Sequence, residues 1–270
     1  MNEHERIMTA LRDCDRQDLY RDPQSLTVEQ KARYEDILRR RQAGEPLQYI
    51  LQQADFLDLA LFVDQRVFIP RPETEILVDT ALHAVRHQPK TCDSILECGT
   101  GCGNIAISLA RGLEQAHITT VDVSRDAIDV AVRNAQRYHV KDRISFVRQD
   151  WRDFIKTAFL RGCKFDMIIS NPPYILSEKI LDLPADVRQE PLLALDGGPE
   201  GLDIIRLIID AAWDILNGQG LLALEIGDGQ HQVVMQLIEQ CGIFKNVALI
   251  DDFSGTPRVI MARRRIGNNL

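Results

Sequence analysis

The sequence predicts an α/β protein whose seven-stranded, mostly parallel sheet follows a small N-terminal helical bundle and a β-hairpin linker. Two observations support this fold class. From residue 94 onward, short and nearly continuous apolar segments alternate with helical ones, which is typical of parallel strands covered by helices on both faces. Residues 1–45 instead place apolar side chains at helical spacing between charged ones. A chain of 270 residues has room for one large core and a small additional domain.

The N-terminal part of the chain is expected to be helical and then to form a hairpin. Residues 25–29, SLTVE, offer a capped helix start, and Gly44 offers a helix stop. Residues 55–69, DFLDLALFVDQRVFI, are rich in β-forming residues and have a polar break at residues 64–66, which predicts a hairpin around this break. We assign residues 1–50 to the bundle and residues 51–75 to the hairpin and linker.

The remainder, residues 76–270, is expected to form the α/β domain. A helix should run from Ile76 to about His87, because prolines and then acidic residues precede it. Strands are expected at residues 94–98, 118–123, 144–149, 165–170, 220–226, 247–251 and 258–263. Helices are expected at residues 103–112, 125–138, 201–217 and 229–241. The last two strands are joined by a loop without a helix, so they should form an antiparallel hairpin at one edge of the sheet.

The composition is that of an ordinary globular protein, with 45% hydrophobic and 27% charged residues. A net charge of −8 argues against a broad nucleic-acid-binding surface. No segment approaches the roughly 18 apolar residues of a membrane span. The first residues, MNEHERIMTALRDCDRQD, are too charged for a signal peptide and too acidic for a transit peptide. We therefore expect a cytoplasmic protein.

The cysteines predict neither a metal site nor a disulfide framework. They are Cys14, Cys92, Cys98, Cys102, Cys163 and Cys241. They form no CxxC pair, and no histidine lies near them at ligand spacing. We interpret them as small buried thiols and expect no bound metal.

A glycine-rich turn follows the first strand of the α/β domain. It reads Glu97-Cys98-Gly99-Thr100-Gly101-Cys102-Gly103 and leads into a helix. Glycines at such a turn let the backbone approach a ligand closely, which suits a dinucleotide, a phosphate or a nucleoside. A P-loop is disfavoured because no Gly-Lys-Ser/Thr follows. The turn therefore predicts a nucleotide or nucleoside site.

An acidic residue ends each of the next two strands. Asp122 lies 23 residues after Gly99, where a carboxylate would bind ribose hydroxyls, which fits both NAD and S-adenosylmethionine. Asp150 and Trp151 follow the third strand and suit the edge and face of an adenine. Together with an E-x-G-x-G-x-G pattern instead of G-x-G-x-x-G, this favours S-adenosylmethionine.

The fourth strand ends in an unusual sequence, SNPPYI, at residues 170–175. Proline has no backbone N–H, and it pushes the preceding residue out of the helical region. Asn171 and Pro172 should therefore be extended just past the sheet, with free carbonyl oxygens and few donors nearby. We interpret this segment as a pre-shaped acceptor site at the carboxyl end of a strand, where ligands bind in open α/β sheets.

These motifs resemble those of the class I S-adenosylmethionine-dependent methyltransferases. Within that class the chain is similar, over nearly its whole length, to the HemK/PrmC group of protein-(glutamine-N5) methyltransferases that act on peptide chain release factors. Further runs that carry the resemblance are GEPLQYI at residues 44–50, IPRPETE at residues 69–75 and EPLLALDGG at residues 190–198. The chain departs from the family at Gln52, where glycine is common, and at Cys98 and Cys102.

The resemblance implies a Rossmann-like class I methyltransferase fold and a site for each reactant. Asn171 and Pro172 would be catalytic, because the glutamine amide would donate to the Asn171 side-chain oxygen and the Pro172 carbonyl. The substrate-binding residues would be Asn171, Pro172, Pro173 and Tyr174, with Tyr174 packed on the amide plane. The cofactor-binding residues would be Gly99, Thr100, Gly101, Cys102, Gly103, Asp122, Asp150, Trp151 and Asn171.

The expected reaction is methylation of the glutamine N5 in the Gly-Gly-Gln motif of class I release factors. The bundle would grip the partner, and the enzyme would be a monomer that binds neither membrane nor nucleic acid directly. A ribosomal-protein glutamine is an alternative substrate. Exocyclic-amine methylation of nucleic acid is disfavoured by the acidic charge, and a non-enzymatic cofactor-binding protein by the presence of Asn171.

The roles of four further residues stay open or point away from the site. Arg71 and Glu73 either shape a lid over the site or form a solvated helix start. Glu190 either contacts a substrate peptide or is structural. Trp213 is expected in the core.

Overall fold

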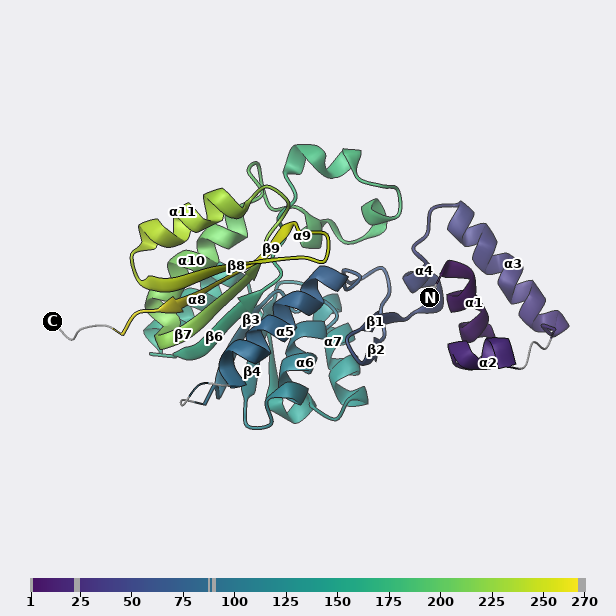
Figure 1. The fold of residues 1–270 in the computed structure, drawn as a ribbon, viewed down its shortest axis with the longest axis horizontal. Helices are drawn as coiled ribbons and strands as arrows, with labels where there is room; N and C mark the ends of the chain where they lie inside the picture. Colours follow the sequence, from purple (N-terminus) through teal and green to yellow (C-terminus); the bar gives the residue numbers. More distant parts are fainter. Residues whose placement is uncertain (1, 22–24, 87, 89–90, 267–270) are drawn as a thin grey trace.

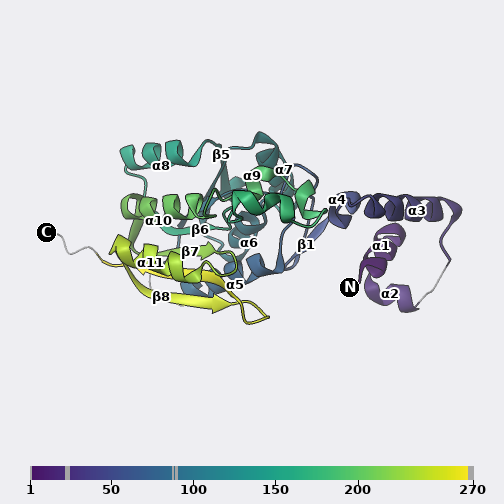
Figure 2. The ribbon, with the colours of Figure 1, turned by 90° about the horizontal axis from the view of Figure 1, so that it is seen from above.

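The computed structural model describes residues 2–21, 25–86, 88 and 91–266. Helices α1 (Glu3–Arg12), α2 (Arg16–Arg21), α3 (Val28–Gln42) and α4 (Leu47–Leu51) lie to one side of the sheet domain (Figures 1 and 2). Asn2 and Thr27 form capping boxes at the starts of α1 and α3. Gly44, with φ +89°, follows the end of α3, as the sequence predicts. Ile7, Ile37 and Ile50 belong to a separate small core between these helices.

The hairpin turns earlier than the sequence suggests. Strands β1 (Ala54–Phe56) and β2 (Leu59–Leu61) pair over three residues, so the predicted break at residues 64–66 was wrong. The reason is that the chain docks on α7 (Arg125–Arg137) beyond β2, where the Phe62 N–H and carbonyl bond the Asn134 side chain. Asp64 and Arg66 form a separate turn, closed by their own ion pair.

The described residues of the α/β domain form one seven-stranded sheet with the order β5-β4-β3-β6-β7-β9-β8. Its strands are β3 (Ser94–Cys98), β4 (His117–Asp122), β5 (Ile144–Arg148), β6 (Phe165–Ser170), β7 (Leu216–Glu225), β8 (Phe244–Asp251) and β9 (Pro257–Arg264). Strands β3 to β7 pair in parallel, and β9 pairs antiparallel with β7 and β8. The mostly parallel sheet and the antiparallel edge hairpin are thus confirmed.

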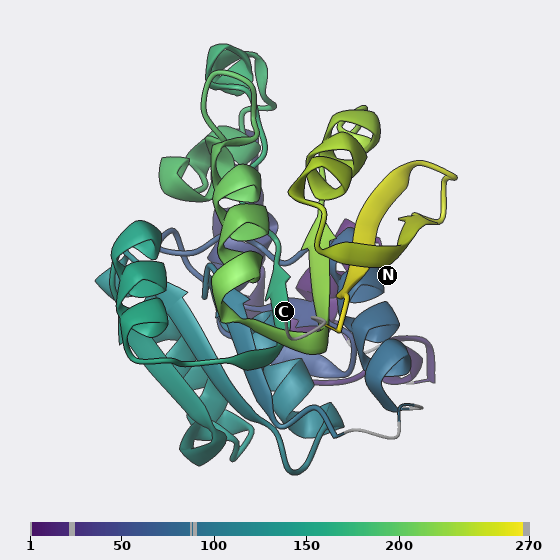
Figure 3. The same cartoon turned by 90° about the vertical axis from the view of Figure 1, so that its left-hand side faces the viewer.

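Two layers of helices cover the sheet (Figure 3). One apolar core contains residues of α5 (Pro72–Arg86), α6 (Asn104–Gly112) and α7. The other contains residues of α8 (Trp151–Leu160), α10 (Asp203–Ile215) and α11 (His231–Cys241). Shorter helical turns lie at η1 (Lys141–Arg143), η2 (Ser177–Asp182), η3 (Val187–Gln189) and α9 (Leu192–Leu195). Among the described residues, no helix combines the length and apolar character that crossing a bilayer requires.

Several expected element boundaries differ from the structure. Helix α5 begins at Pro72 and not at Ile76, because proline is tolerated in the first helical turn; its expected end near His87 lies outside the described residues. Helix α8 was not predicted, and β7 follows α10 directly at Leu216 without the expected loop. Trp213 was wrongly placed in the core: inward positions such as Ile208 fill the apolar stripe of α10, and Trp213 is 55% exposed.

Candidate active site

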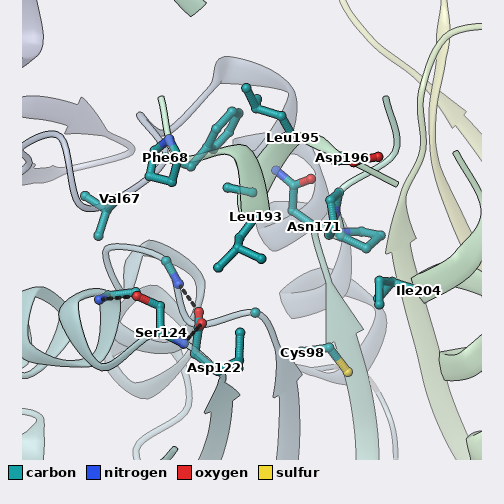
Figure 4. Close-up of a pocket in the computed structure, with 18 of the residues that line it drawn as sticks. Val67, Phe68, Cys98, Asp122, Ser124, Asn171, Leu193, Leu195, Asp196 and Ile204 are labelled. Carbon is teal, nitrogen blue, oxygen red and sulfur yellow. Dashed lines mark hydrogen bonds between the residues drawn. The ribbon is translucent and has the colours of Figure 1, made fainter. Parts of the chain in front are cut away.

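A cavity of about 640 Å³ lies at the carboxyl edge of the parallel strands. Figure 4 shows that Asp122 and Asn171 contribute polar groups to its wall, and that Val67, Phe68 and Leu193 contribute apolar ones. The segments that line it come from the ends of β3, β4 and β6, from the start of α8 and from residues 187–196. This is the position in which open α/β sheets bind ligands.

The glycine loop after β3 supplies one wall. Gly99 and Gly101 line the cavity with φ angles of +86° and +52°, which favour glycine. A Cβ on Gly101 would meet nothing within 4 Å, so the backbone there is open to a ligand. Thr100 and Gly103, also expected in the site, do not line the cavity. The Thr100 hydroxyl is buried and hydrogen-bonded to the Thr120 hydroxyl over 2.7 Å, and Gly103 packs on α7.

Cys98 and Cys102 both line the cavity at the base of this loop. Both are buried, as the sequence predicts, whereas Cys163 is exposed, so the prediction of a buried thiol was wrong there. Burial raises the pKa of the Cys102 thiol to about 12, so it stays protonated and poorly reactive at neutral pH. The two cysteines are therefore small packing residues here, and not nucleophiles.

Asp122 ends β4 beside the loop, where the sequence predicted a ribose-binding carboxylate. Its Oδ2 accepts from the Gly101 N–H over 3.3 Å and its Oδ1 from the Ser124 N–H over 2.8 Å (Figure 4). Burial raises the pKa of Asp122, and these backbone donors counteract the rise. The carboxylate is therefore held at a fixed place in the cavity wall.

Asp150 and Trp151 also line the cavity, from the turn between β5 and α8. The Asp150 side chain caps α8 by accepting from the Arg152 N–H over 2.8 Å. The Trp151 ring packs edge-on against Phe154, with 6.1 Å between ring centroids. The structure thus brings both residues to the same cavity as the glycine loop and Asp122.

Asn171 faces the glycine loop from the end of β6. Its side-chain Nδ2 donates to the Thr74 Oγ1 over 2.9 Å, and the Thr74 hydroxyl donates to the Glu225 Oε2 over 2.7 Å. The Asn171 side-chain oxygen has no hydrogen-bond partner among the residues that the structure describes. Pro172, Pro173 and Tyr174 line the cavity next to it. The Asn171 side-chain oxygen is therefore available as an acceptor, and the role of the Pro172 carbonyl stays a prediction.

The EPLLALDGG run supports this segment from behind. Ile175 donates to the Leu195 carbonyl over 3.0 Å, and Gly197 donates back to the Ile175 carbonyl over 2.8 Å. The backbones are so close that a Cβ on Gly197 would lie 2.7 Å from the Pro173 oxygen. Buried Gln230 adds a further hydrogen bond, from its Nε2 to the Tyr174 carbonyl over 3.1 Å. The SNPPYI and EPLLALDGG runs thus pack together as one unit.

Glu190 is structural, which resolves the open choice for this residue. It is buried, its Oε2 accepts from the Ile69 N–H over 3.0 Å, and it forms an ion pair with Arg71. The Arg71 guanidinium also lies over the Phe68 ring, 4.8 Å from its centroid, and Arg71 lines the cavity, whereas Glu73 does not. The ion pair therefore fixes the IPRPETE run against the rim of the site.

Sequence reasoning missed three polar residues that hold this site together: Thr74, Glu225 and Gln230. All three are buried. Thr74 lies within the IPRPETE run, and Glu225 closes an apolar strand, so both offered a signal that could have been used. Gln230, in the turn before α11, offered none, because nothing in a single sequence pairs it with Tyr174.

Two family descriptions match the chain. A methyltransferase domain matches residues 89–197, and the PrmC N-terminal domain matches residues 2–51. The ribosomal protein L11 methylase of Lactobacillus delbrueckii subsp. bulgaricus superposes with a TM-score of 0.51 at 18% identity, covering 75% of this chain and 84% of that one, and shares the fold. The fold is that of the class I S-adenosylmethionine-dependent methyltransferases.

Sequence relatives narrow this class. The release factor glutamine methyltransferase of Moorella thermoacetica is 41% identical over 233 residues, which cover 86% of this chain and 80% of that protein. The release factor glutamine methyltransferase of Gloeobacter violaceus is 39% identical over 226 residues, which cover 83% of this chain and 76% of that protein. The chain belongs to the release factor glutamine methyltransferase family.

Proposed function

We propose that this protein transfers a methyl group from S-adenosylmethionine to the side-chain N5 of the glutamine in the Gly-Gly-Gln motif of class I peptide chain release factors. The observation that carries the proposal is the position of Asn171. Its amide donor is used by Thr74, its oxygen is left free, and it faces the glycine loop across one cavity. Membership of the release factor glutamine methyltransferase family supports the choice of substrate.

The residues of the cavity fit S-adenosylmethionine. The open backbone at Gly101 accepts close approach of a ligand, and the Asp122 carboxylate next to it suits ribose hydroxyls. Asp150 and Trp151 would hold the adenine, and the volume of about 640 Å³ lies within the range of small-molecule sites. When bound, S-adenosylmethionine supplies an electrophilic methyl group. Thr100 and Gly103 would act only through the shape of the loop.

We call residues 170–175, SNPPYI, the acceptor segment. It would compensate for the poor nucleophilicity of an amide, whose nitrogen lone pair is delocalised into the carbonyl. The two amide hydrogens would be accepted by the Asn171 side-chain oxygen and the Pro172 carbonyl. These bonds orient the nitrogen, and they strengthen as positive charge develops on it, which favours the transition state. Orientation of this kind contributes up to roughly 7–11 kcal/mol.

The other residues of the acceptor segment would pack against the substrate amide and exclude water from it. Tyr174 would pack on the amide plane and exclude water, with Pro173 beside it in the cavity wall. No strong general base is required, because the proton leaves the nitrogen after transfer. The two acceptors proposed for the amide, the Asn171 side-chain oxygen and the Pro172 carbonyl, are accordingly neutral oxygens.

The N-terminal helices are proposed to hold the release factor while the cavity takes its glutamine. They stand beside the sheet domain (Figure 2), and the Gln189 side chain donates to the Gly44 carbonyl over 2.9 Å. This contact places the bundle next to the segment at residues 187–196 that lines the site. A protein bound across both parts would therefore reach the cavity. A monomeric, cytoplasmic enzyme that binds no nucleic acid directly stays a prediction.

The test is a transfer assay with methyl-labelled S-adenosylmethionine. Separate reactions contain a release factor, the same factor with the Gly-Gly-Gln glutamine replaced, ribosomal subunits, and DNA. We expect label only in the intact release factor. Label in a ribosomal protein or in DNA would contradict the substrate assignment and leave the methyltransferase chemistry in place.

The matched variant is Asn171→Ala. It should abolish measurable transfer and leave binding of S-adenosylmethionine, measured by calorimetry, nearly unchanged. Equal loss of both would show that Asn171 serves the cofactor and not the glutamine amide.

A further inference from the structure

The Asn171 side chain is the first member of a hydrogen-bonded chain that crosses three elements. It runs from Asn171, after β6, to Thr74 in the first turn of α5 and on to Glu225 at the end of β7, over 2.9 Å and 2.7 Å. Thr74 is 1% exposed and Glu225 is fully buried. Neither residue lines the cavity.

The direction of this chain follows from counting donors and acceptors. An ionised carboxylate only accepts, so the one hydroxyl proton of Thr74 is directed to Glu225. The Thr74 oxygen is then left with acceptor capacity alone on the side of Asn171. Only the amide NH₂ of Asn171 satisfies it, and the Asn171 oxygen is turned away.

We propose that Thr74 and Glu225 are positioning residues that fix the orientation of the Asn171 amide, so that its oxygen and not its NH₂ meets the substrate amide. The proposal rests on the proposed function, in which the substrate presents an NH₂ group. A flipped Asn171 would place donor against donor, and the nucleophilic nitrogen would lose one of its two acceptors. We name the pair the Thr74–Glu225 relay.

A second contact ties the relay to the same segment. The Tyr174 hydroxyl donates to the other Glu225 oxygen, Oε1, over 3.4 Å. One buried carboxylate therefore holds two of the four residues of the Asn-Pro-Pro-Tyr sequence, at its first and last positions. Loss of the charge on Glu225 would loosen both contacts together.

Protonation of Glu225 would remove the constraint, because a protonated carboxyl can itself donate to Thr74. Burial raises the pKa of Glu225 to about 7; Glu73 adds to the rise, and Thr74, Tyr174 and Arg258 counteract it. Since the carboxylate is ionised above this pH, kcat should fall as the pH drops through about 7. Thr74 would then be free to donate to Asn171, and the amide could turn.

The kinetic test compares Thr74→Val, Thr74→Ser and Glu225→Gln with the wild-type enzyme. Thr74→Val keeps the shape of the side chain without its hydroxyl and should lower kcat by up to about a hundredfold, because misplacement of a reacting group has costs of this size. Cofactor affinity should not change, and Thr74→Ser should keep most of the activity.

Glu225→Gln should lower kcat and lose the fall in rate below about pH 7. The control Ser108→Ala removes another buried helical hydroxyl, bonded to the Asn104 carbonyl over 2.7 Å, and should leave kcat unchanged.

A spectroscopic test needs no substrate and uses the wild-type protein and Thr74→Val. In protein labelled with ¹⁵N at asparagine, the Asn171 side-chain NH₂ signals should shift with an apparent pKa near 7, and Thr74→Val should remove that shift. The relay would be overturned if the Asn171 NH₂ chemical shifts changed neither with pH nor in Thr74→Val. Equal kcat values for Thr74→Val and wild type would overturn it as well. If the signals respond as expected but no release factor is methylated, the relay stands and the proposed substrate fails.

Discussion

The two loops that face each other across the cavity each stand beside a fully buried glutamate, but they are held in different ways. The loop after β3 is shaped by positive-φ glycines and by a backbone bond from Gly103 to the Thr100 carbonyl over 2.8 Å, and the neighbouring strand β4 adds bonds to Thr100 and Gly101. Neither carboxylate oxygen of Glu97, at the end of β3, has a hydrogen-bond partner among the described residues. The segment after β6 contains no glycine, and distant side chains hold it, with both Glu225 oxygens bonded.

This difference separates a loop that must stay open from a segment that must stay fixed. The glycine loop requires close backbone approach, so its side chains are minimal, and the side chains that support it, Thr120, Asp122 and Asn134, lie only 20 to 32 residues away in the chain. The acceptor segment requires two oxygens at fixed positions, so it is held from the start of α5, the end of β7 and residues 195–201. A substitution that disturbs the distant support of the acceptor segment should therefore lower the stability strongly. A substitution within the glycine loop should lower it only a little.

The largest expected effect is that of Gly201→Ala, behind the acceptor segment. Gly201 has a φ of +68°, and a Cβ there would lie 2.3 Å from the Tyr174 carbonyl oxygen and 2.8 Å from the Gln230 Nε2. Left-handed strain and overpacking together should lower the free energy of unfolding by about 3–5 kcal/mol. Urea denaturation measures this loss.

The control for Gly201→Ala is Gly242→Ala at the end of α11. Gly242 has a similar φ of +72°, but a Cβ there would meet nothing within 4 Å. It should lose only the strain component, about 1–2 kcal/mol. Equal losses of unfolding free energy at the two positions would show that the close contact with the Tyr174 carbonyl adds no cost to replacing Gly201.

The same contrast explains what the sequence could predict. The glycine loop, Asp122 and the Asn-Pro-Pro-Tyr segment are local patterns, and the structure places all three at the cavity. Thr74, Glu225 and Gln230 act through contacts that span 51 to 97 residues of chain, so no local pattern could pair them with the acceptor segment. Knowing that strand ends meet at one edge would have placed Glu225 near Asn171, but not the threonine between them.

The errors in the fold have equally specific causes. Helix α8 escaped prediction because Asp150 and Trp151 were interpreted as the end of a strand, although Asp150 is also the N-cap of that helix. The hairpin turn was placed at residues 64–66 because polarity was taken as the turn signal. The turn instead uses Leu57 with a φ of +51°, which polarity does not reveal. A tertiary contact decides the second case, since Asn134 binds the backbone that would otherwise continue the strand pairing.

A smaller effect, which depends on pH, is expected for Glu97→Gln beneath the glycine loop. Burial raises the pKa of Glu97 from 4.5 to about 8. The folded protein keeps a proton that the unfolded chain releases, so this residue makes the stability fall as the pH rises from about 4.5 to about 8. Glu97→Gln should remove that part of the decline, so its stability relative to wild type should rise by up to about 1.4 kcal/mol for each pH unit between pH 5 and pH 8.

Urea denaturation across that pH range checks the prediction for Glu97. Glu225 contributes a decline of the same sign, up to its pKa of about 7, and this part should remain in Glu97→Gln. Parallel stability curves for the variant and the wild type would contradict a raised pKa at Glu97. The two buried glutamates would then differ less than their hydrogen bonds suggest.

The smallest expected effect on stability is that of Gly101→Ala within the glycine loop. Its φ of +52° imposes strain, but a Cβ there would touch nothing within 4 Å, so the loss should be only about 1 kcal/mol. Because Gly101 lines the cavity, the added methyl group should instead weaken the binding of S-adenosylmethionine, as measured by calorimetry. A loss of stability as large as that of Gly201→Ala, with cofactor affinity intact, would mean that the glycine loop also depends on close packing, and the distinction between an open loop and a fixed segment would no longer hold.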